Sequence, residues 1–230
     1  MRPCLVISDL HIPHGHPDAL AFCQAVQKKY RLEEIVFIGD IVDMHAMSYH
    51  EHDPQLDSAD VELEKSKKLI RPWKDAFPQA RVCMGNHDSL IDRKAFTHGL
   101  PRQVLKHINE VLGTKGWNWA EEHILPCGNH YVVFRHSWGP NIEQAMMRNG
   151  TSVVAGHWHS KSSIMYAQTS FQRMFAMQVG CLVDTSHPAF SYNRRDIRRP
   201  ILNVGKIVDG EPALLSLNVD KHGRWTGVVP

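Results

Sequence analysis

The chain has 230 residues, a formal net charge of +2 and 16 histidines, a high number for this length. The small net charge does not by itself indicate nucleic-acid binding. The five cysteines are scattered and contain no Cys-x-x-Cys pair, which argues against a disulfide framework and against a cysteine zinc site. Without a long apolar run or a signal-peptide pattern, the sequence predicts a cytoplasmic protein with no membrane segment.

The first half of the chain alternates predicted strands with predicted helices. Short apolar runs predict buried strands, and apolar residues at helical spacing predict helices. In chain order these are a strand at 4–7, a helix at 18–30, a strand at 35–38, a helix at 59–77 with a break or kink near Pro72, and a strand at 81–84. The segment 44–58 is polar and rich in histidine, and we expect it to be a loop inserted over the strand ends.

The second half of the chain turns gradually to strands. The pattern predicts a helix at 101–112, a strand at 130–135, a helix at 142–148, a strand at 152–155, short strands from 164 onward, and a hairpin of 201–208 with 213–219. Strand–helix alternation followed by strands predicts an α/β fold of two packed sheets with helices outside them. Because no repeat or linker is present, we expect a single domain over residues 1–230.

Polar residues that can bind metals directly follow the predicted strands. They form the series Asp9-x-His11, Gly39-Asp40-x-x-Asp43, Gly85-Asn86-His87-Asp88, His136 and Gly156-His157-x-His159. In an α/β sheet, ligands bind in the crevice at the carboxyl ends of the strands, so these side chains are expected to converge. Any one cluster alone is explained as well by an ordinary turn or a packed histidine. The ordered series favours a metal site, and its donors suit Mn, Fe or Zn.

This series resembles the signature of the calcineurin-like metallophosphoesterase superfamily, in a compact form of bacterial or phage type, and it spans residues 9–159. The resemblance implies a four-layer α/β-β/α sandwich of two mixed β-sheets flanked by helices, with two divalent metal ions. It assigns Asp9, His11 and His159 to the first metal, Asn86, His136 and His157 to the second, and Asp40 to both. It also implies that His87 faces the substrate phosphate and that Asp88 orients the His87 ring.

The implied activity is hydrolysis of phosphomonoesters or phosphodiesters by a hydroxide that the metals activate, so the chain is predicted to be a metal-dependent phosphoric ester hydrolase. Two metal ions can stabilise both the attacking and the leaving oxygen of an in-line displacement. Manganese is the expected metal, with Fe, Zn, Ni and Mg as alternatives. A protonated His87 would stabilise charge on the phosphoryl oxygens or give a proton to the leaving group.

Several residues near the series are candidates for substrate binding. His45, His50 and His52 in the loop, together with Arg93, could bind phosphate, and Trp138 could stack on a nucleobase. The alternatives are a solvated loop, a solvated helix face and a packing role for the tryptophan. The basic run 194–199 could contact a polyanion or be a solvated loop. Nucleotides or nucleic-acid ends are the favoured substrates, and the oligomeric state is not predicted.

Two other functions remain open. Protein serine/threonine phosphatases of this superfamily carry arginine at the position of Met44 and glutamate at the position of Asp88, and this sequence departs from both. A non-catalytic scaffold that retains the fold is expected to have lost metal ligands. The sequence has every expected ligand, which favours an enzyme.

Overall fold

A computed structural model describes residues 1–49, 56–187 and 198–230 of the chain. One sheet contains strands β1 (Cys4–Ile7), β2 (Glu34–Phe37), β3 (Ala80–Cys83), β4 (Trp117–Ala120), β10 (Asn203–Val208) and β11 (Glu211–Ser216). The other contains β5 (Glu122–Cys127), β6 (His130–Arg135), β7 (Ser152–Ala155), β8 (Ser163–Gln168) and β9 (Arg173–Gln178). Their spatial orders are β11-β10-β1-β2-β3-β4 and β5-β6-β7-β9-β8.

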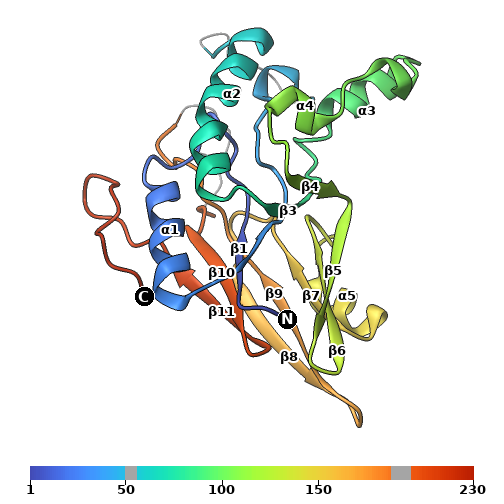
Figure 1. The fold of residues 1–230 in the computed structure, drawn as a ribbon, viewed down its shortest axis with the longest axis vertical. Coiled ribbons are helices and arrows are strands. Elements are labelled where there is room, and N and C mark those ends of the chain that lie inside the picture. The colour runs from blue at the N-terminus through green and yellow to red at the C-terminus, as the bar shows by residue number, and fades with distance from the viewer. Residues whose placement is uncertain (50–55, 188–197) are drawn as a thin grey trace.

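Helices cover the outer faces of both sheets (Figure 1). The helices of the described residues are α1 (Ala19–Tyr30), α2 (Ala59–Ala76), α3 (Leu90–Thr97), α4 (Ile108–Leu112) and α5 (Ile142–Asn149), with 3₁₀ turns η1 (His45–Met47) and η2 (Arg102–Val104). Of these, α3 and α4 lie beyond the ends of the strands (Figure 1). Helices α1 and α2 pack on the first sheet, and α5 packs on β7 and β9 of the second. The predicted sandwich of two mixed sheets flanked by helices is confirmed.

The strands next to the sheet–sheet interface are buried on both faces. In β1, Leu5 and Ile7 pack toward α1 and α2, whereas Cys4 and Val6 pack toward the second sheet and reach Phe134. Because successive side chains of a strand point to opposite faces, such strands read as continuous apolar runs. Polar residues that begin after the run therefore lie at the end of the strand and not on a face.

The carboxyl ends of the central strands lie at a common edge. Strands β1, β2, β3 and β4 run parallel, and so do β6, β7 and β9. The outer strands β10, β11, β5 and β8 are antiparallel to their neighbours, so both sheets are mixed. Parallel pairing in each sheet places the residues that follow β1, β2, β3, β6 and β7 close together, and these are the residues of the polar series.

The structure corrects several predicted elements. The predicted helix over 101–112 is divided into η2 and α4, because Ile108, Val111 and Leu112 pack on the core whereas Val104 is 66% exposed. Helix α2 runs through Pro72 without the predicted break. Helix α3 and strands β4 and β5 were not predicted. All five cysteines are free and buried.

None of the helices in the described part of the chain combines the length and the apolar character that crossing a membrane requires.

The centre of the first sheet is tightly packed around Phe37, and we predict a large loss of stability when its ring is removed. Phe37 is fully buried, and its ring meets those of Trp73, Phe77 and Trp117 at centroid distances of 6.0, 6.2 and 4.8 Å. Truncation leaves a cavity, so Phe37→Ala is expected to lower the free energy of unfolding by about 3–5 kcal/mol. Urea unfolding followed by tryptophan fluorescence measures this change.

The matched control is Phe171→Ala, because Phe171 is 90% exposed. That variant is expected to unfold within about 0.5 kcal/mol of the parent protein. Equal stabilities of the two variants would contradict the packing described here.

Candidate metal centre

The first group of the site joins the end of β1 to the loop that follows β7. It consists of Asp9, His11 and His159, whose ligand atoms lie within 4.8 Å of one another. The Nε2 atom of His159 lies 3.2 Å from Oδ1 of Asp9 and 3.1 Å from Nε2 of His11. Asp9 and His11 are buried, with exposed fractions of 0% and 2%. Two imidazole nitrogens and a carboxylate oxygen facing one another at such distances form a set of donors that suits Zn, Mn or Fe.

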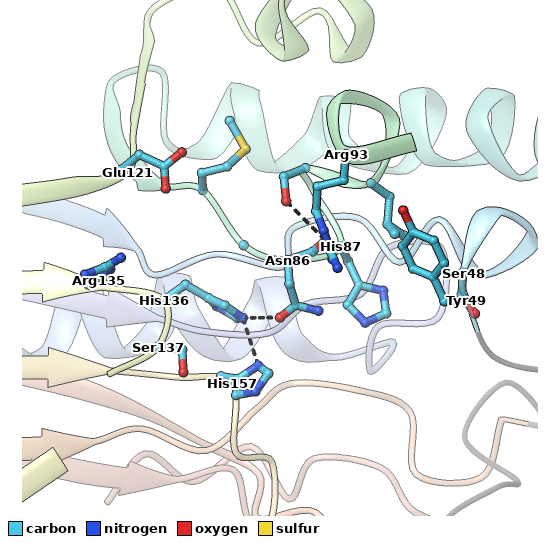
Figure 2. Close-up of a pocket in the computed structure, with 14 residues that line it drawn as sticks. Ser48, Tyr49, Asn86, His87, Arg93, Glu121, Arg135, His136, Ser137 and His157 are labelled. Atoms are coloured by element: carbon cyan, nitrogen blue, oxygen red, sulfur yellow. Dashed lines mark hydrogen bonds between the residues drawn. The ribbon is translucent and has the colours of Figure 1, made fainter. Parts of the chain in front are cut away.

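The second group joins the ends of β3, β6 and β7. Figure 2 shows the His136 ring joined by dashed lines to Asn86 and to His157, and all three residues line an open cavity. The Nε2 atom of His136 lies 2.9 Å from Oδ1 of Asn86 and 3.2 Å from Nδ1 of His157. The same nitrogen lies 3.2 Å from Oδ2 of Asp40. Asp40, His136 and His157 together could hold a metal ion.

Asp40 lies between the two groups and is 2% exposed. Its Oδ2 atom is 3.7 Å from Nε2 of His11 and 3.2 Å from Nε2 of His136. Gly85 makes this position possible, because a Cβ atom at Gly85 would lie only 2.1 Å from Oδ1 of Asp40. One carboxylate is therefore in reach of both groups, which is the geometry that a bridging ligand needs.

Four of these residues have a left-handed backbone conformation. Asp9, His11, Asp40 and His157 have φ values of 50°, 48°, 51° and 72°. This region costs a side-chain-bearing residue on the order of 1–3 kcal/mol, although aspartate and histidine tolerate it better than most. The turn after each strand aims these side chains across the sheet edge. Such strain persists only where surrounding packing fixes it, and it concentrates at functional sites.

Hydrogen bonds to the far nitrogens fix two of the imidazole rings. His11 donates from Nδ1 to Oδ1 of Asp43 at 2.6 Å, and His136 donates from Nδ1 to the carbonyl oxygen of Ile38 at 2.8 Å. These bonds leave Nε2 of each ring directed at the two groups. A carboxylate or a carbonyl behind the ring is the usual support of a metal-binding histidine. The residues present therefore fit divalent metal ions.

The charges of the two groups are strongly coupled. Burial disfavours a charged His136, yet the neighbouring Asp40 carboxylate raises the pKa of His136 to about 10. Burial likewise opposes ionisation of Asp40, but the charge of His136 holds the pKa of Asp40 below its usual range. Asp9 behaves in the same way, because hydrogen bonds from His11 and His159 lower its pKa despite burial. The ionised carboxylates are thus paired with protonated imidazoles, and a metal ion bound to the ring nitrogens would take the place of those protons.

In the structure, the hydrogen-bond partners of His87 and Asp88 differ from those that the predicted roles imply. His87 lines the cavity, and its Nδ1 donates to the carbonyl oxygen of Asp43 at 2.5 Å. The Asp88 carboxylate accepts hydrogen bonds from the backbone amides of Ile41, Val42 and Gly85 at 3.0, 3.2 and 3.0 Å. The prediction that Asp88 orients the His87 ring is wrong on this geometry, because Asp43 makes that contact. Asp88 instead ties the loops after β2 and β3 together.

Burial and the charge of Asp40 raise the pKa of Asp88 to about 7. Burial, followed by the charge of His11, lowers the pKa of His87. Neutral His87 keeps its Nδ1–H on Asp43 and presents Nε2 to the cavity as an acceptor, and its protonated form presents a donor there. His87 is therefore placed to exchange a proton with a ligand in the cavity.

An open cavity of about 540 Å³ adjoins the second group, and Figure 2 shows its lining. Arg93 lines it, with the guanidinium carbon 5.3 Å from the centroid of the Tyr49 ring. Among the described residues, His45 and Trp138 do not line this cavity. His45 faces Oδ2 of Asp43 at 3.8 Å, and Trp138 packs against α5 and carries Arg135 over its ring at 5.4 Å.

The remaining candidates for substrate binding are His50 and His52, which lie outside the described residues, as do 194–197 of the basic run.

Sequence reasoning missed three residues at the site. Asp43 was part of the motif Gly39-Asp40-x-x-Asp43, and its fixed spacing after Asp40 was the available signal. Tyr49 and Arg135 line the cavity, but neither stands in a motif that would mark it. Tyr49 and Arg135 reach the cavity because the tertiary fold brings their separate segments to the same edge of the sheets.

The proteins to which this chain is similar support the fold described above. The sequence model of the family described as "Calcineurin-like phosphoesterase" matches residues 2–161. An archaeal phosphodiesterase structure is similar to this chain with a TM-score of 0.52 and 11% identity, covering 94% of this chain and 99% of that one. The Chaetomium thermophilum Vps29 structure is similar with a TM-score of 0.51 and 11% identity, covering 100% and 96%. No curated protein sequence matches the chain.

The matching region contains the complete polar series, from the end of β1 to His159. The two sheets, their helical cover and the convergence of that series at one edge agree with the sequence match. The chain belongs to the calcineurin-like phosphoesterase family.

Proposed function

We propose that this protein is a metal-dependent phosphoesterase that uses two divalent metal ions, with manganese favoured, and acts on nucleotides or nucleic-acid ends. The observation that carries the proposal is the placement of Asp40 within 3.7 Å of His11 and 3.2 Å of His136, between two groups of donors that border an open cavity. A protein that used the fold only as a binding surface would have no need of this arrangement.

The proposed ligands follow from the two groups. Asp9, His11 and His159 would hold one ion, Asn86, His136 and His157 the other, and Asp40 both. When bound, the ions supply the Lewis acidity and the activated water that hydrolysis of a phosphate ester needs. The protein's part is to fix the donors, and it does so through the bonds from His11 to Asp43 and from His136 to Ile38.

His87 is proposed to serve the leaving group. Its ring is fixed by the bond from Nδ1 to the Asp43 carbonyl, so Nε2 is the atom that can give a proton to a departing oxygen. The negative charge of a bound phosphate opposes the lowered pKa of His87, since an opposite charge nearby favours the protonated ring. Arg93 adds a fixed positive charge to the same cavity.

The surroundings of the cavity favour a substrate with an apolar or aromatic part beside its phosphate. Tyr49 is 57% exposed at the cavity and carries Arg93 and Lys94 over its ring. A second cavity of about 720 Å³ shares Met84, Ser89, Arg93 and Glu121 with the first and is lined by Phe96 and Leu100. A nucleotide combines a phosphate with a flat base that stacks on aromatic side chains, and it suits this pair of cavities.

The protein phosphatase alternative gains no support from these contacts. Met44 occupies the position at which those enzymes carry arginine, and it is buried at 1% exposure within the core. The predicted cytoplasmic location and the single-domain organisation stay predictions.

We predict metal-dependent hydrolysis of 4-nitrophenyl phosphate or bis(4-nitrophenyl) phosphate when Mn²⁺ is added to metal-free protein. Asp40→Asn is expected to lower turnover by more than about 100-fold, because even a change behind a metal ligand costs 10–100-fold. The control is Asp75→Asn on the exposed face of α2, which should leave turnover unchanged. Equal activity of the two variants would exclude the proposed centre, and the preferred ester would separate a phosphatase from a diesterase.

A second prediction concerns the crowding at Gly85. Gly85→Ala is expected to displace the Asp40 carboxylate and to abolish most of the rise in melting temperature that Mn²⁺ gives the parent protein. Differential scanning fluorimetry with and without Mn²⁺ measures this shift. Gly128→Ala serves as the control, because no atom lies within 4 Å of a Cβ at that glycine. It should keep the Mn²⁺ shift even if its overall stability falls.

The leaving-group role of His87 gives a third prediction. A nitrophenolate departs without a proton, whereas the alkoxide of a nucleotide needs one. His87→Ala is therefore expected to slow hydrolysis of a nucleoside monophosphate by about 10²–10⁴-fold and that of the nitrophenyl ester much less. Steady-state rates with both esters test this difference. An equal loss on both esters would assign His87 to charge stabilisation and not to proton donation.

A further inference from the structure

A separate group of potential metal ligands lies behind the His11 ring. His14 follows β1, Asp43 follows β2, and Glu62 lies in the first turn of α2. All three are buried, with exposed fractions of 6%, 3% and 2%. One ligand atom from each lies within 4.8 Å of the others. The function proposed above uses neither His14 nor Glu62.

We propose that His14, Asp43 and Glu62 form a third cation site, which binds one divalent transition-metal ion such as Zn²⁺. An imidazole nitrogen and two carboxylate oxygens are a donor set that Zn²⁺ accepts in proteins. The site is distinct from the candidate metal centre, because Asp43 contacts the Nδ1 side of His11, whereas Nε2 of that ring faces Asp9 and His159.

The distances within the group suit an ion better than direct hydrogen bonds. The Nε2 atom of His14 lies 3.7 Å from Oδ2 of Asp43 and 3.8 Å from Oε1 of Glu62. Both distances exceed the range of a hydrogen bond. Donors bound to one ion at about 2.1 Å lie roughly 3–4 Å from each other. The three donor atoms therefore surround a space of the size that a metal ion needs.

An unsatisfied oxygen points into this space. Within the described residues, Oδ2 of Asp43 has no hydrogen-bond partner, although Asp43 is only 3% exposed. Its other oxygen, Oδ1, already accepts the bond from His11. The nearest imidazole nitrogens, of His14 and His45, lie 3.7 and 3.8 Å from this oxygen, beyond the range of a hydrogen bond. Leaving a buried carboxylate oxygen without a hydrogen bond is costly, because it has lost its hydration. A cation at this position would remove that cost.

The second carboxylate of the group is held firmly in place. Glu62 accepts hydrogen bonds from the backbone amides of His45 and Ala46 at 2.7 and 2.9 Å, so its side chain cannot turn away from Asp43. Two buried carboxylates close together repel each other, and a divalent ion between them would offset this repulsion. Helix α2 is fixed to the same loop by Ser66, whose hydroxyl donates to the carbonyl oxygen of Ile12 at 3.1 Å.

The site would act on the candidate metal centre through Asp43. That residue accepts the Nδ1 hydrogen of His11 on its carboxylate and the Nδ1 hydrogen of His87 on its backbone carbonyl. An ion bound to Oδ2 holds the Asp43 side chain in the position that supports the His11 ring. Its effect is structural, and it joins the loops after β1 and β2 to the start of α2.

The decisive test is a crystal structure of the full chain grown with Zn²⁺, with anomalous data collected on both sides of the zinc absorption edge. The proposal expects an anomalous peak among Nε2 of His14, Oδ2 of Asp43 and Oε1 of Glu62. Density without anomalous signal would indicate a buried water and would overturn the proposal, as would an empty site. Because the map resolves each position separately, a peak here would support the third site even if the dinuclear centre were empty.

Metal content in solution gives an independent measure. After loading with Zn²⁺ and desalting, Glu62→Gln is expected to retain one zinc ion fewer per chain than the parent protein, by inductively coupled plasma mass spectrometry. The matched control is Glu64→Gln, since Glu64 lies on the same helix with its carboxylate exposed beside Lys67. Identical zinc contents in the two variants would overturn the proposal. If Glu62→Gln does not fold, His14→Gln takes its place.

Discussion

The packing of two sheets face to face is the constraint on which the rest of the structure depends. It buries one face of β1 and β2 while α1 and α2 cover the other, so a polar side chain placed along these strands would lose its hydration. Polar groups are left only at the strand ends. Since the central strands of each sheet run parallel, those ends meet at one edge, and the donors of the candidate metal centre collect there.

The precise orientation of the donor side chains at this edge comes from the backbone conformation and from a layer of supporting hydrogen bonds. The left-handed turns at Asp9, Asp40 and His157 direct the side chains, and the amide hydrogens around Asp88 hold the loops that carry them. Asp43 serves both the His11 ring and the His87 ring. The orientations of the donor side chains are thus fixed by hydrogen-bond partners that are themselves buried. This is the usual condition for a preorganised site.

The sequence predicted this architecture well where local patterns decide the structure. Apolar runs identified β1, β2, β3, β6 and β7, and the polar residues after them identified the proposed ligands. Prediction from the sequence failed where tertiary packing decides the structure. The segment 101–112 has helical spacing, but only its second half, with Ile108, Val111 and Leu112, packs against the core. Asp88 stands next to His87 in the chain, yet its carboxylate turns to backbone amides that no sequence pattern reveals.

The same limit applies to residues that are distant in the chain. His14, Asp43 and Glu62 come together only because α2 lies over the loops after β1 and β2. Trp138 stands two residues after His136, and sequence proximity suggested a substrate contact. Trp138 packs instead against α5, so proximity to His136 in the sequence does not place it in the cavity.

Each of the two donor groups takes members from both sheets. Asp9 and His11 belong to the first sheet and His159 to the second, and the other group joins Asn86 and Asp40 to His136 and His157. Occupancy of the centre is therefore thermodynamically linked to the docking of one sheet on the other. A ligand that favours the docked arrangement strengthens metal affinity, and any sliding of the sheets weakens both positions together. A metal ion bound there would hold the two sheets together, and the metal affinity would depend on how the sheets are aligned.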